Sequence, residues 1–291
     1  MTATSRRNPA RPGDVPSPAR APRDVSPVLA RRELVLVAVV LVGLTRLVER
    51  PDAFLVAGLL PVVMLLAGTG VLGAEETGRP FEALIIPSVL PGGFAAASHL
   101  VPAGLWLVPA VAAFAILLDR ALALEIRLIG QPTGPTETDR SRVLLAAVVT
   151  AFIAFTGVAT LVPGGLAEPG GAAAGGQTLT EGWLTVLAID DALIALLLGY
   201  RLALFRYGSA ADAARSALTY AFVVAVAAGA VRAIDIPRLL GPAVLTLVFY
   251  LWDALHAAAP ARRREPRFLW EAALLAILGT VVVAWNLQLR G

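Results

Sequence analysis

The sequence predicts an all-α fold, a polytopic bundle of about nine transmembrane helices with the N-terminus inside. Of the 291 residues, 57% are hydrophobic and only 15% are charged, whereas a soluble domain has about 25% charged residues. The charges gather between apolar runs that approach the length of about 20 residues needed to cross a bilayer. A transmembrane β-barrel would alternate apolar and polar residues in strands of about 10, and the run at 143–162 does not alternate.

The first element is a basic, proline-rich tail at 1–32. It holds seven arginines, six prolines and few large apolar residues, so it cannot bury enough surface to fold. We expect a disordered cytoplasmic tail that sets the topology or meets anionic headgroups. A cleavable signal would reach its apolar core sooner, and here the first apolar run starts at Leu34. Residues 33–291 then form one multi-spanning domain.

Nine apolar segments follow the tail, and one region leaves their number open. In 83–118, prolines and the Gly92-Gly93 pair interrupt the apolar run, and such residues break the backbone hydrogen-bond ladder of a membrane helix. This region therefore crosses either once or twice. With two crossings, the predicted spans are 34–48, 53–73, 83–98, 100–118, 143–163, 182–200, 216–231, 238–257 and 268–287.

The positions of the arginines favour two crossings. All 24 basic residues are arginine, and cytoplasmic loops are enriched in Lys and Arg. Two crossings place 19 of the 24 on the side of the N-terminus, whereas a single crossing places 11 there. A seven-span alternative, in which 34–48 does not cross and 83–118 crosses once, places 20 there. However, a helix in the interface needs a polar face, and 34–48 is apolar on all sides, so nine spans are favoured.

Two connecting segments have features of their own. Residues 121–129 follow Asp119 and Arg120, and we expect a short interfacial helix there. The glycine-rich segment 164–181 lacks arginine and is expected outside, as a flexible connector or a substrate lid.

Few residues have the pattern of a reactive or metal-binding site. The chain has no cysteine, which excludes disulfides, thiol catalysis and cysteine metal sites. It has only two histidines, whereas a structural zinc site needs four ligands, so no metal and no other cofactor is expected. Asp253 and His256 lie three residues apart and share a helix face. They are interpreted as interfacial anchors, with a proton relay as the alternative.

The strongest candidates are Asp190 and Asp191, adjacent aspartates in the middle of the apolar segment 182–200. A charged side chain at the bilayer centre costs about 2.5–3.5 kcal/mol on insertion scales. It must be protonated, paired, bound to a cation or turned to a wet cavity. The nearest bases along the predicted spans are Arg46 and Arg201.

Helical geometry separates the two carboxylates. Ala188, Ala192, Ala195 and Gly199 form a stripe of small residues, which lets helices approach closely. At about 100° per residue, Asp191 lies roughly 70° from the centre of this stripe and Asp190 roughly 170° away. Asp191 should therefore flank a tight helix contact, whereas Asp190 needs a different neighbour or water. Both either fix packing by hydrogen bonds or carry protons or cations.

These observations favour a non-catalytic integral membrane protein, such as a scaffold, an assembly partner or an accessory subunit. The alternative is a small proton- or cation-coupled transporter or channel that uses the Asp190/Asp191 pair, with a discontinuous helix at 87–93 lining its site. A lesser alternative is a lipid-modifying enzyme, for which Asp253 and His256 are the only hint. The arginine-only, alanine-rich composition suggests a GC-rich bacterium and its plasma (inner) membrane. The expected partners are the bilayer and a membrane protein or a second copy, and no nucleic acid.

Overall fold

The computed structural model describes residues 27–49, 52–71, 80–102, 104–129, 131, 135–166, 180–207, 209–233, 239–258 and 265–288. The described residues form helices and turns, with no strand. The helices are α1 (Pro27–Thr45), α2 (Asp52–Val71), α3 (Pro80–Ala83), α4 (Ile85–Ala97), the 3-10 turn η1 (Ser98–Leu100), α5 (Leu107–Ile129), α6 (Glu137–Leu161), α7 (Glu181–Ala203), α8 (Ala210–Ala233), α9 (Leu240–Ala257) and α10 (Pro266–Gln288).

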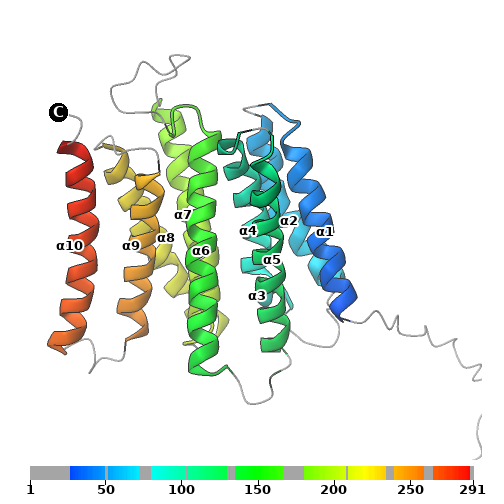
Figure 1. Ribbon diagram of the computed structural model, residues 1–291. Helices are drawn as coiled ribbons and strands as arrows, with labels where there is room; N and C mark the ends of the chain where they lie inside the picture. Colours follow the sequence, from blue (N-terminus) through cyan, green and yellow to red (C-terminus); the bar gives the residue numbers. More distant parts are fainter. Residues whose placement is uncertain are drawn as a thin grey trace, which may run out of the picture.

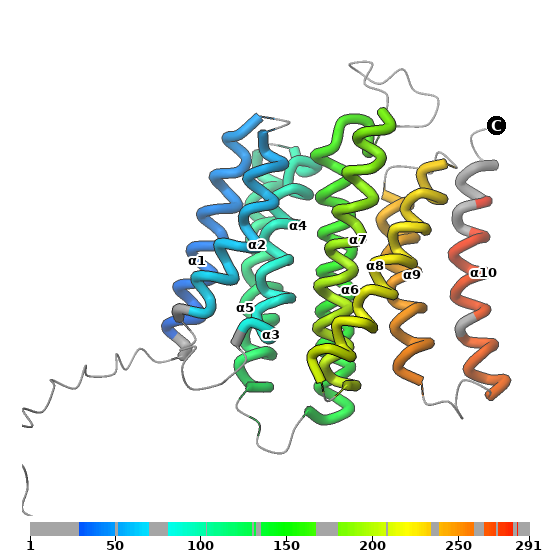
Figure 2. Tube along the Cα trace, turned by 180° about the vertical axis from the view of Figure 1, so that it is seen from behind, coloured from blue at the N-terminus to red at the C-terminus, as the bar shows by residue number. Residues whose placement is uncertain are grey.

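The long helices stand side by side and alternate in direction along the chain (Figures 1 and 2). One group contains α1, α2, α4 and α5, the other contains α6 to α9, and α4 packs against α6 where the groups meet. Helix α10 lies at the edge of the bundle beside α9. The predicted helical bundle is confirmed.

Seven helices of the described ranges are long and apolar enough to cross a membrane, which indicates a membrane-embedded protein. They include both helices of the ambiguous region, as Phe81–Leu100 and Leu107–Ile129, and these run in opposite directions (Figure 1). This set differs from both sequence interpretations, because α1 and α10 are not among the seven. Helix α1 carries Arg31, Arg32 and Glu33 near its start. The number of spans and the side of the N-terminus stay predictions.

Helix α4 is the centre of the structure. In the most apolar stretch of Phe81–Leu100, 72% of the residues are buried, against 22% for Leu107–Ile129. The chain is helical without a break through Pro91, Gly92 and Gly93, so the expected discontinuous helix at 87–93 is wrong. These small residues let other helices approach: a Cβ at Gly93 would lie 2.7 Å from the Cα of Ala154 on α6.

The other side of α4 is packed in the same way. A Cβ at Gly92 would lie 2.8 Å from the carbonyl oxygen of Ala57 on α2. On the side that faces α6, the contact is equally close from the partner helix, because a Cβ at Gly157 of α6 would lie 2.9 Å from the Cβ of Ala96 on α4. Close approach of this kind is how helices associate in lipid, where dispersion rather than hydrophobic exclusion drives packing.

Three element boundaries differ from the sequence expectation. Helix α1 begins at Pro27, so 27–32 of the expected tail are helical, while 1–26 lie outside the described residues. Residues 121–129 continue α5 and form no separate interfacial helix. Helix α6 begins earlier than 143 because Thr136 and Asp139 form a capping box, which satisfies free N–H groups of the first turn. Most of the glycine-rich segment 164–181 lies outside the described residues.

One end of the bundle is rich in arginine, and we call it the basic end. It is the end at which α1, α6, α8 and α10 begin and α2, α5, α7 and α9 end (Figure 1). Only two of the twelve described arginines, Arg46 and Arg232, belong to the opposite half. The other ten are Arg31, Arg32, Arg120, Arg127, Arg140, Arg142, Arg201, Arg206, Arg215 and Arg267.

The α4–α6 contact leads to a stability prediction. Replacing Gly93 by Leu forces a side chain into the backbone of α6 and should cost about 1–3 kcal/mol or more of unfolding free energy, as overpacking does. The control is Gly58→Leu on α2, where a Cβ meets nothing within 4 Å. Unfolding of both variants in detergent should show a loss for Gly93→Leu alone. Equal stability of the two variants would mean that α4 does not pack this tightly.

Candidate functional site

The structure gives Asp191 a partner. Asp191 is fully buried on α7, and its Oδ2 accepts a hydrogen bond of 2.8 Å from Nη2 of Arg232 on α8. The Arg232 side chain is 11% exposed, and its Nη1 also donates to the carbonyl oxygen of Ala228 at 3.2 Å. Among the described residues, the most buried carboxylate is thus held by an arginine of the neighbouring helix.

Sequence reasoning missed Arg232 because it lies just beyond the predicted end of its span. The direction of helical side chains is the signal that could have found it. Side chains tilt toward the N-terminus of their helix, and α7 and α8 run in opposite directions (Figure 2). The long Arg232 side chain therefore points back into the bundle, toward the level of Ala228, where Asp191 points toward it from α7.

Asp190 has a different environment. It is partly buried, and its Oδ2 is shielded from solvent with no hydrogen-bond partner among the described residues. It shares a face of α7 with Leu187, three positions before it, and Leu187 packs against Ala159 and Val162 at the end of α6. Asp190 therefore lies on the flank toward α6. On that helix, the Oγ1 of Thr156 is likewise buried without a partner.

The stripe of small residues makes the tight contact that its spacing predicts. Ala195 is fully buried, and a Cβ at Gly199 would lie 2.7 Å from Cγ of Tyr220 on α8. The two helices therefore meet closely along this stripe, and Asp191 lies beside the contact.

The two arginines considered from the sequence have other partners. Arg46 donates to the carbonyl oxygens of Ser98 and Val101, at 2.6 and 3.1 Å, and so caps the end of α4 and η1, where a positive charge is favourable. Arg201 forms a bidentate pair with the buried Glu125 of α5, at 3.1 and 2.5 Å.

A second polar cluster lies at the basic end and contains one of the weaker candidates. Asp253 on α9 is buried, and its Oδ1 accepts hydrogen bonds from Arg206 and from the Tyr220 hydroxyl. Arg206 also donates to that hydroxyl at 2.7 Å. Burial acts to lower the pKa of Arg206, which lies in the turn after α7, but the Asp253 carboxylate raises it above its ordinary value. Arg206 therefore stays charged, and Asp253 ties α9 to α7 and α8.

His256 lies beside this cluster but faces a pocket. Its Nδ1 is 3.0 Å from the carbonyl oxygen of Trp252, and its ring centroid lies 4.4 Å from that of Trp252. The pocket has a volume of about 480 Å³, and the buried Oγ of Ser216 on its wall has no hydrogen-bond partner in the described part of the chain. The pocket is lined by Tyr207, Asp212, Arg215, Ser216, Thr219 and His256.

Arginine–carboxylate pairs between different elements are a general feature of this bundle. Within the described ranges there are five such pairs, and four of the carboxylates are at most 5% exposed. A pair with good geometry and further hydrogen bonds offsets the cost of removing both charges from water. The pairs are Arg31–Asp119, Arg127–Asp139, Arg201–Glu125, Arg206–Asp253 and Arg232–Asp191.

These residues limit the chemistry that the described part of the chain can support. No group of three or more His, Asp or Glu side chains comes together there as metal ligands. Neither Asp190 nor Asp191 lines the pocket beside His256 or the groove between α5 and α6. The aspartate pair therefore consists of one carboxylate held by Arg232 and, beside it, one without a hydrogen-bond partner among the described residues.

Comparison of the chain with protein-family models, curated proteins and solved structures gives no match.

The Asp191–Arg232 pair leads to a prediction about stability. Replacing Asp191 by Asn leaves Arg232 buried without a counter-charge, and breaking a buried pair in this way costs about 3–5 kcal/mol. The double variant Asp191→Leu/Arg232→Met should recover most of that loss, because it removes both charges. Unfolding free energies in detergent measure both effects.

The control for this experiment is Arg215→Gln. It breaks an exposed pair with Asp212, in which the side chains are 79% and 52% exposed, and such pairs contribute about 0–1 kcal/mol. If Asp191→Asn were no less stable than this control, the pair would not hold α7 and α8 together.

Proposed function

We propose that this protein is a non-catalytic integral membrane protein, a scaffold, assembly or accessory subunit of the bacterial plasma membrane. The observation that supports this most directly is the use of its charges. Within the described ranges, four buried carboxylates and one partly exposed carboxylate are paired with arginines of other elements. Groups that serve transport or catalysis are instead presented to a cavity, because they must reach a substrate or water.

The proposed topology follows from the same charges. In our proposal nine helices cross the membrane, the N-terminus is inside, and the basic end faces the cytoplasm, as the positive-inside rule requires. The two described arginines of the opposite half are already satisfied by protein groups, Arg46 by two carbonyl oxygens and Arg232 by Asp191. Because protein groups already satisfy these two guanidinium groups, their place on the side away from the cytoplasm is consistent with the proposed topology.

Helix α10 is the proposed contact for a membrane-protein partner or a second copy. Among the described helices, α10 packs closely only against α9. Its apolar side chains Trp270, Leu274 and Ile277 are 65%, 57% and 53% exposed. A single helix at the edge of a bundle has little of its own packing, so a partner helix would add the van der Waals contacts that stabilise helices in lipid.

Asp190 supports a second candidate, a proton- or cation-coupled carrier or channel. Its Oδ2 and the Oγ1 of Thr156 lie on the neighbouring helices α7 and α6, and both are buried with no hydrogen-bond partner in the described part of the chain. An ionisable residue inside a membrane bundle is a site for proton transfer by default. The lesser candidate is a lipid-modifying enzyme, favoured only by the pocket at the basic end that Asp212 and His256 line together.

Flux measurements distinguish the first two candidates. The purified protein in proteoliposomes, under a pH or sodium gradient, should give the flux of empty vesicles, because no carboxylate serves as a carrier. Asp190→Asn should change nothing, and it should fold normally because Asp190 loses no hydrogen bond. A flux above that of empty vesicles that disappears in Asp190→Asn would reject the proposal and establish the coupled carrier.

Cross-linking tests the partner side of the proposal. A photoreactive residue in place of Ile277 on α10 should give one discrete protein adduct in native membranes. The matched control replaces Leu36, which is 64% exposed. It belongs to α1, the helix at the other edge of the bundle (Figure 1). Lipid adducts alone at both positions would contradict a partner on α10.

A further inference from the structure

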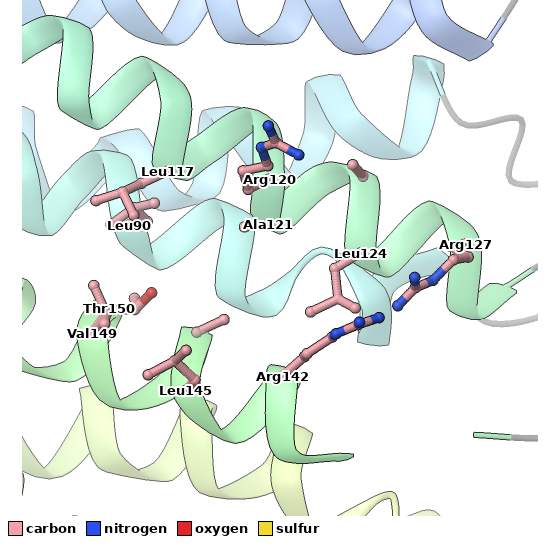
Figure 3. A pocket seen from close by; sticks show the side chains of 12 residues that line it. Leu90, Leu117, Arg120, Ala121, Leu124, Arg127, Arg142, Leu145, Val149 and Thr150 are labelled. Carbon is pink, nitrogen blue, oxygen red and sulfur yellow. The ribbon is translucent and has the colours of Figure 1, made fainter. Parts of the chain in front are cut away.

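The groove between α5 and α6 combines an apolar channel with a cluster of arginines. It has a volume of about 550 Å³, within the range of about 300–1,000 Å³ that is usual for ligand sites. Figure 3 shows its lining side chains, with Leu90, Leu117 and Val149 at one end and Arg120, Arg127 and Arg142 toward the other. The arginines lie toward the basic end of the bundle.

The spacing of these residues explains why they share one groove. Arg120 and Arg127 on α5 are seven residues apart, which is two turns of helix and a rise of about 10 Å on the same face. On α6, Arg142, Leu145 and Val149 follow one another at intervals of three and four residues and also share a face. The buried Leu90 of α4 closes the groove from behind.

The arginines of the groove are not neutralised as those of the bundle are. Arg120 is exposed and has no hydrogen bond or ion pair among the described residues, and its neighbour Asp119 is bound to Arg31 at 2.7 Å. Arg127 and Arg142 share a single carboxylate, that of Asp139, at 2.7 and 3.9 Å. Two guanidinium groups therefore share one carboxylate, and Arg120 adds a third positive charge with no counter-charge among the described residues.

The carboxylate of Asp139 has little capacity left for a second arginine. Besides the bond from Arg127, it accepts hydrogen bonds from the hydroxyl and the backbone N–H of Thr136 and from Gln131. The guanidinium groups of Arg127 and Arg142 point toward one another in the groove (Figure 3), and their side chains are 46% and 55% exposed. Two like charges placed this way favour an anion between or beside them.

We propose that this groove binds an anionic glycerophospholipid. The phosphate lies beside Arg127 and Arg142, with Arg120 as a further positive charge on the same wall of the groove, and an acyl chain lies along Leu117, Leu124, Leu145 and Val149 toward the centre of the bundle. Guanidinium groups bind phosphate through directed N–H donors, and basic pockets between membrane helices on the cytoplasmic side are typical headgroup sites. The apolar wall selects a lipid over a soluble phosphate, because a soluble phosphate has no chain to bury there.

The test compares lipids added to the delipidated full-length protein in detergent. Phosphatidylglycerol should raise the unfolding temperature and remain bound in native mass spectra, whereas zwitterionic phosphatidylcholine should do neither to the same extent. The double variant Arg120→Gln/Arg142→Gln keeps the Arg127–Asp139 pair and should weaken phosphatidylglycerol binding about 25-fold, at about fivefold for each basic residue near the headgroup.

Two further variants distinguish a general effect of positive charge at the basic end from binding in the groove. Arg267→Gln removes an arginine of the basic end whose side chain is 89% exposed on α10, and it should bind phosphatidylglycerol as the parent does. Ala123→Phe fills the groove without changing its charge. It should weaken the binding of phosphatidylglycerol and leave any effect of inorganic phosphate unchanged. This second variant keeps the proposal testable if the double arginine variant does not fold.

Three outcomes would overturn the proposal. Equal stabilisation by phosphatidylcholine would show only unspecific solvation of an apolar surface. An equal effect of inorganic phosphate would show a site for free phosphate. Unchanged binding of phosphatidylglycerol to Ala123→Phe would place the lipid elsewhere on the protein.

Discussion

The structure depends on the pairing of the buried carboxylates of the described helices with arginines from other elements. Hydrocarbon does not solvate ions, so a carboxylate within the bundle is stable only beside a base, a proton or water. Here arginine supplies the base in every cross-element pair of the described residues, and its planar fork can bind both oxygens of one carboxylate, as Arg201 does with Glu125. These pairs tie α1 to α5, α5 to α6 and α7, α7 to α8, and the turn after α7 to α9.

Close backbone packing complements the ion pairs. The centre of the bundle is α4, whose Gly92 and Gly93 lie against α2 and α6 where a larger side chain would collide with backbone atoms. Prolines and glycines in a membrane segment are often interpreted as a break that lines a site. In this chain they remove side-chain volume from a continuous helix, so α4 serves as the packing core between the two groups of helices.

The adjacent aspartates show how one helical step changes the role of a residue. A rotation of about 100° separates their side chains, so Asp191 faces Arg232 on α8 while Asp190 lies on the flank toward α6. The first is part of the framework. The second is the carboxylate to which the structure assigns no partner among the described residues, and it is therefore the residue on which the alternative proposal of proton coupling depends. The proposed lipid site lies apart from both, between α5 and α6, and uses arginines that the framework leaves incompletely neutralised.

The sequence by itself determined the all-α class, the approximate helices and the separation of the two aspartates, because these follow from hydropathy, length and helical periodicity. The tight contact at Gly199 also followed from spacing alone. Only the tertiary structure decided which arginine meets which carboxylate: Arg46 and Arg201 were the nearest bases along the spans, yet Arg232 is the partner of Asp191. Pairing depends on which helices become neighbours and on how far a long side chain reaches back along its own helix. Likewise, the groove between α5 and α6 exists only once these two helices and α4 have become neighbours.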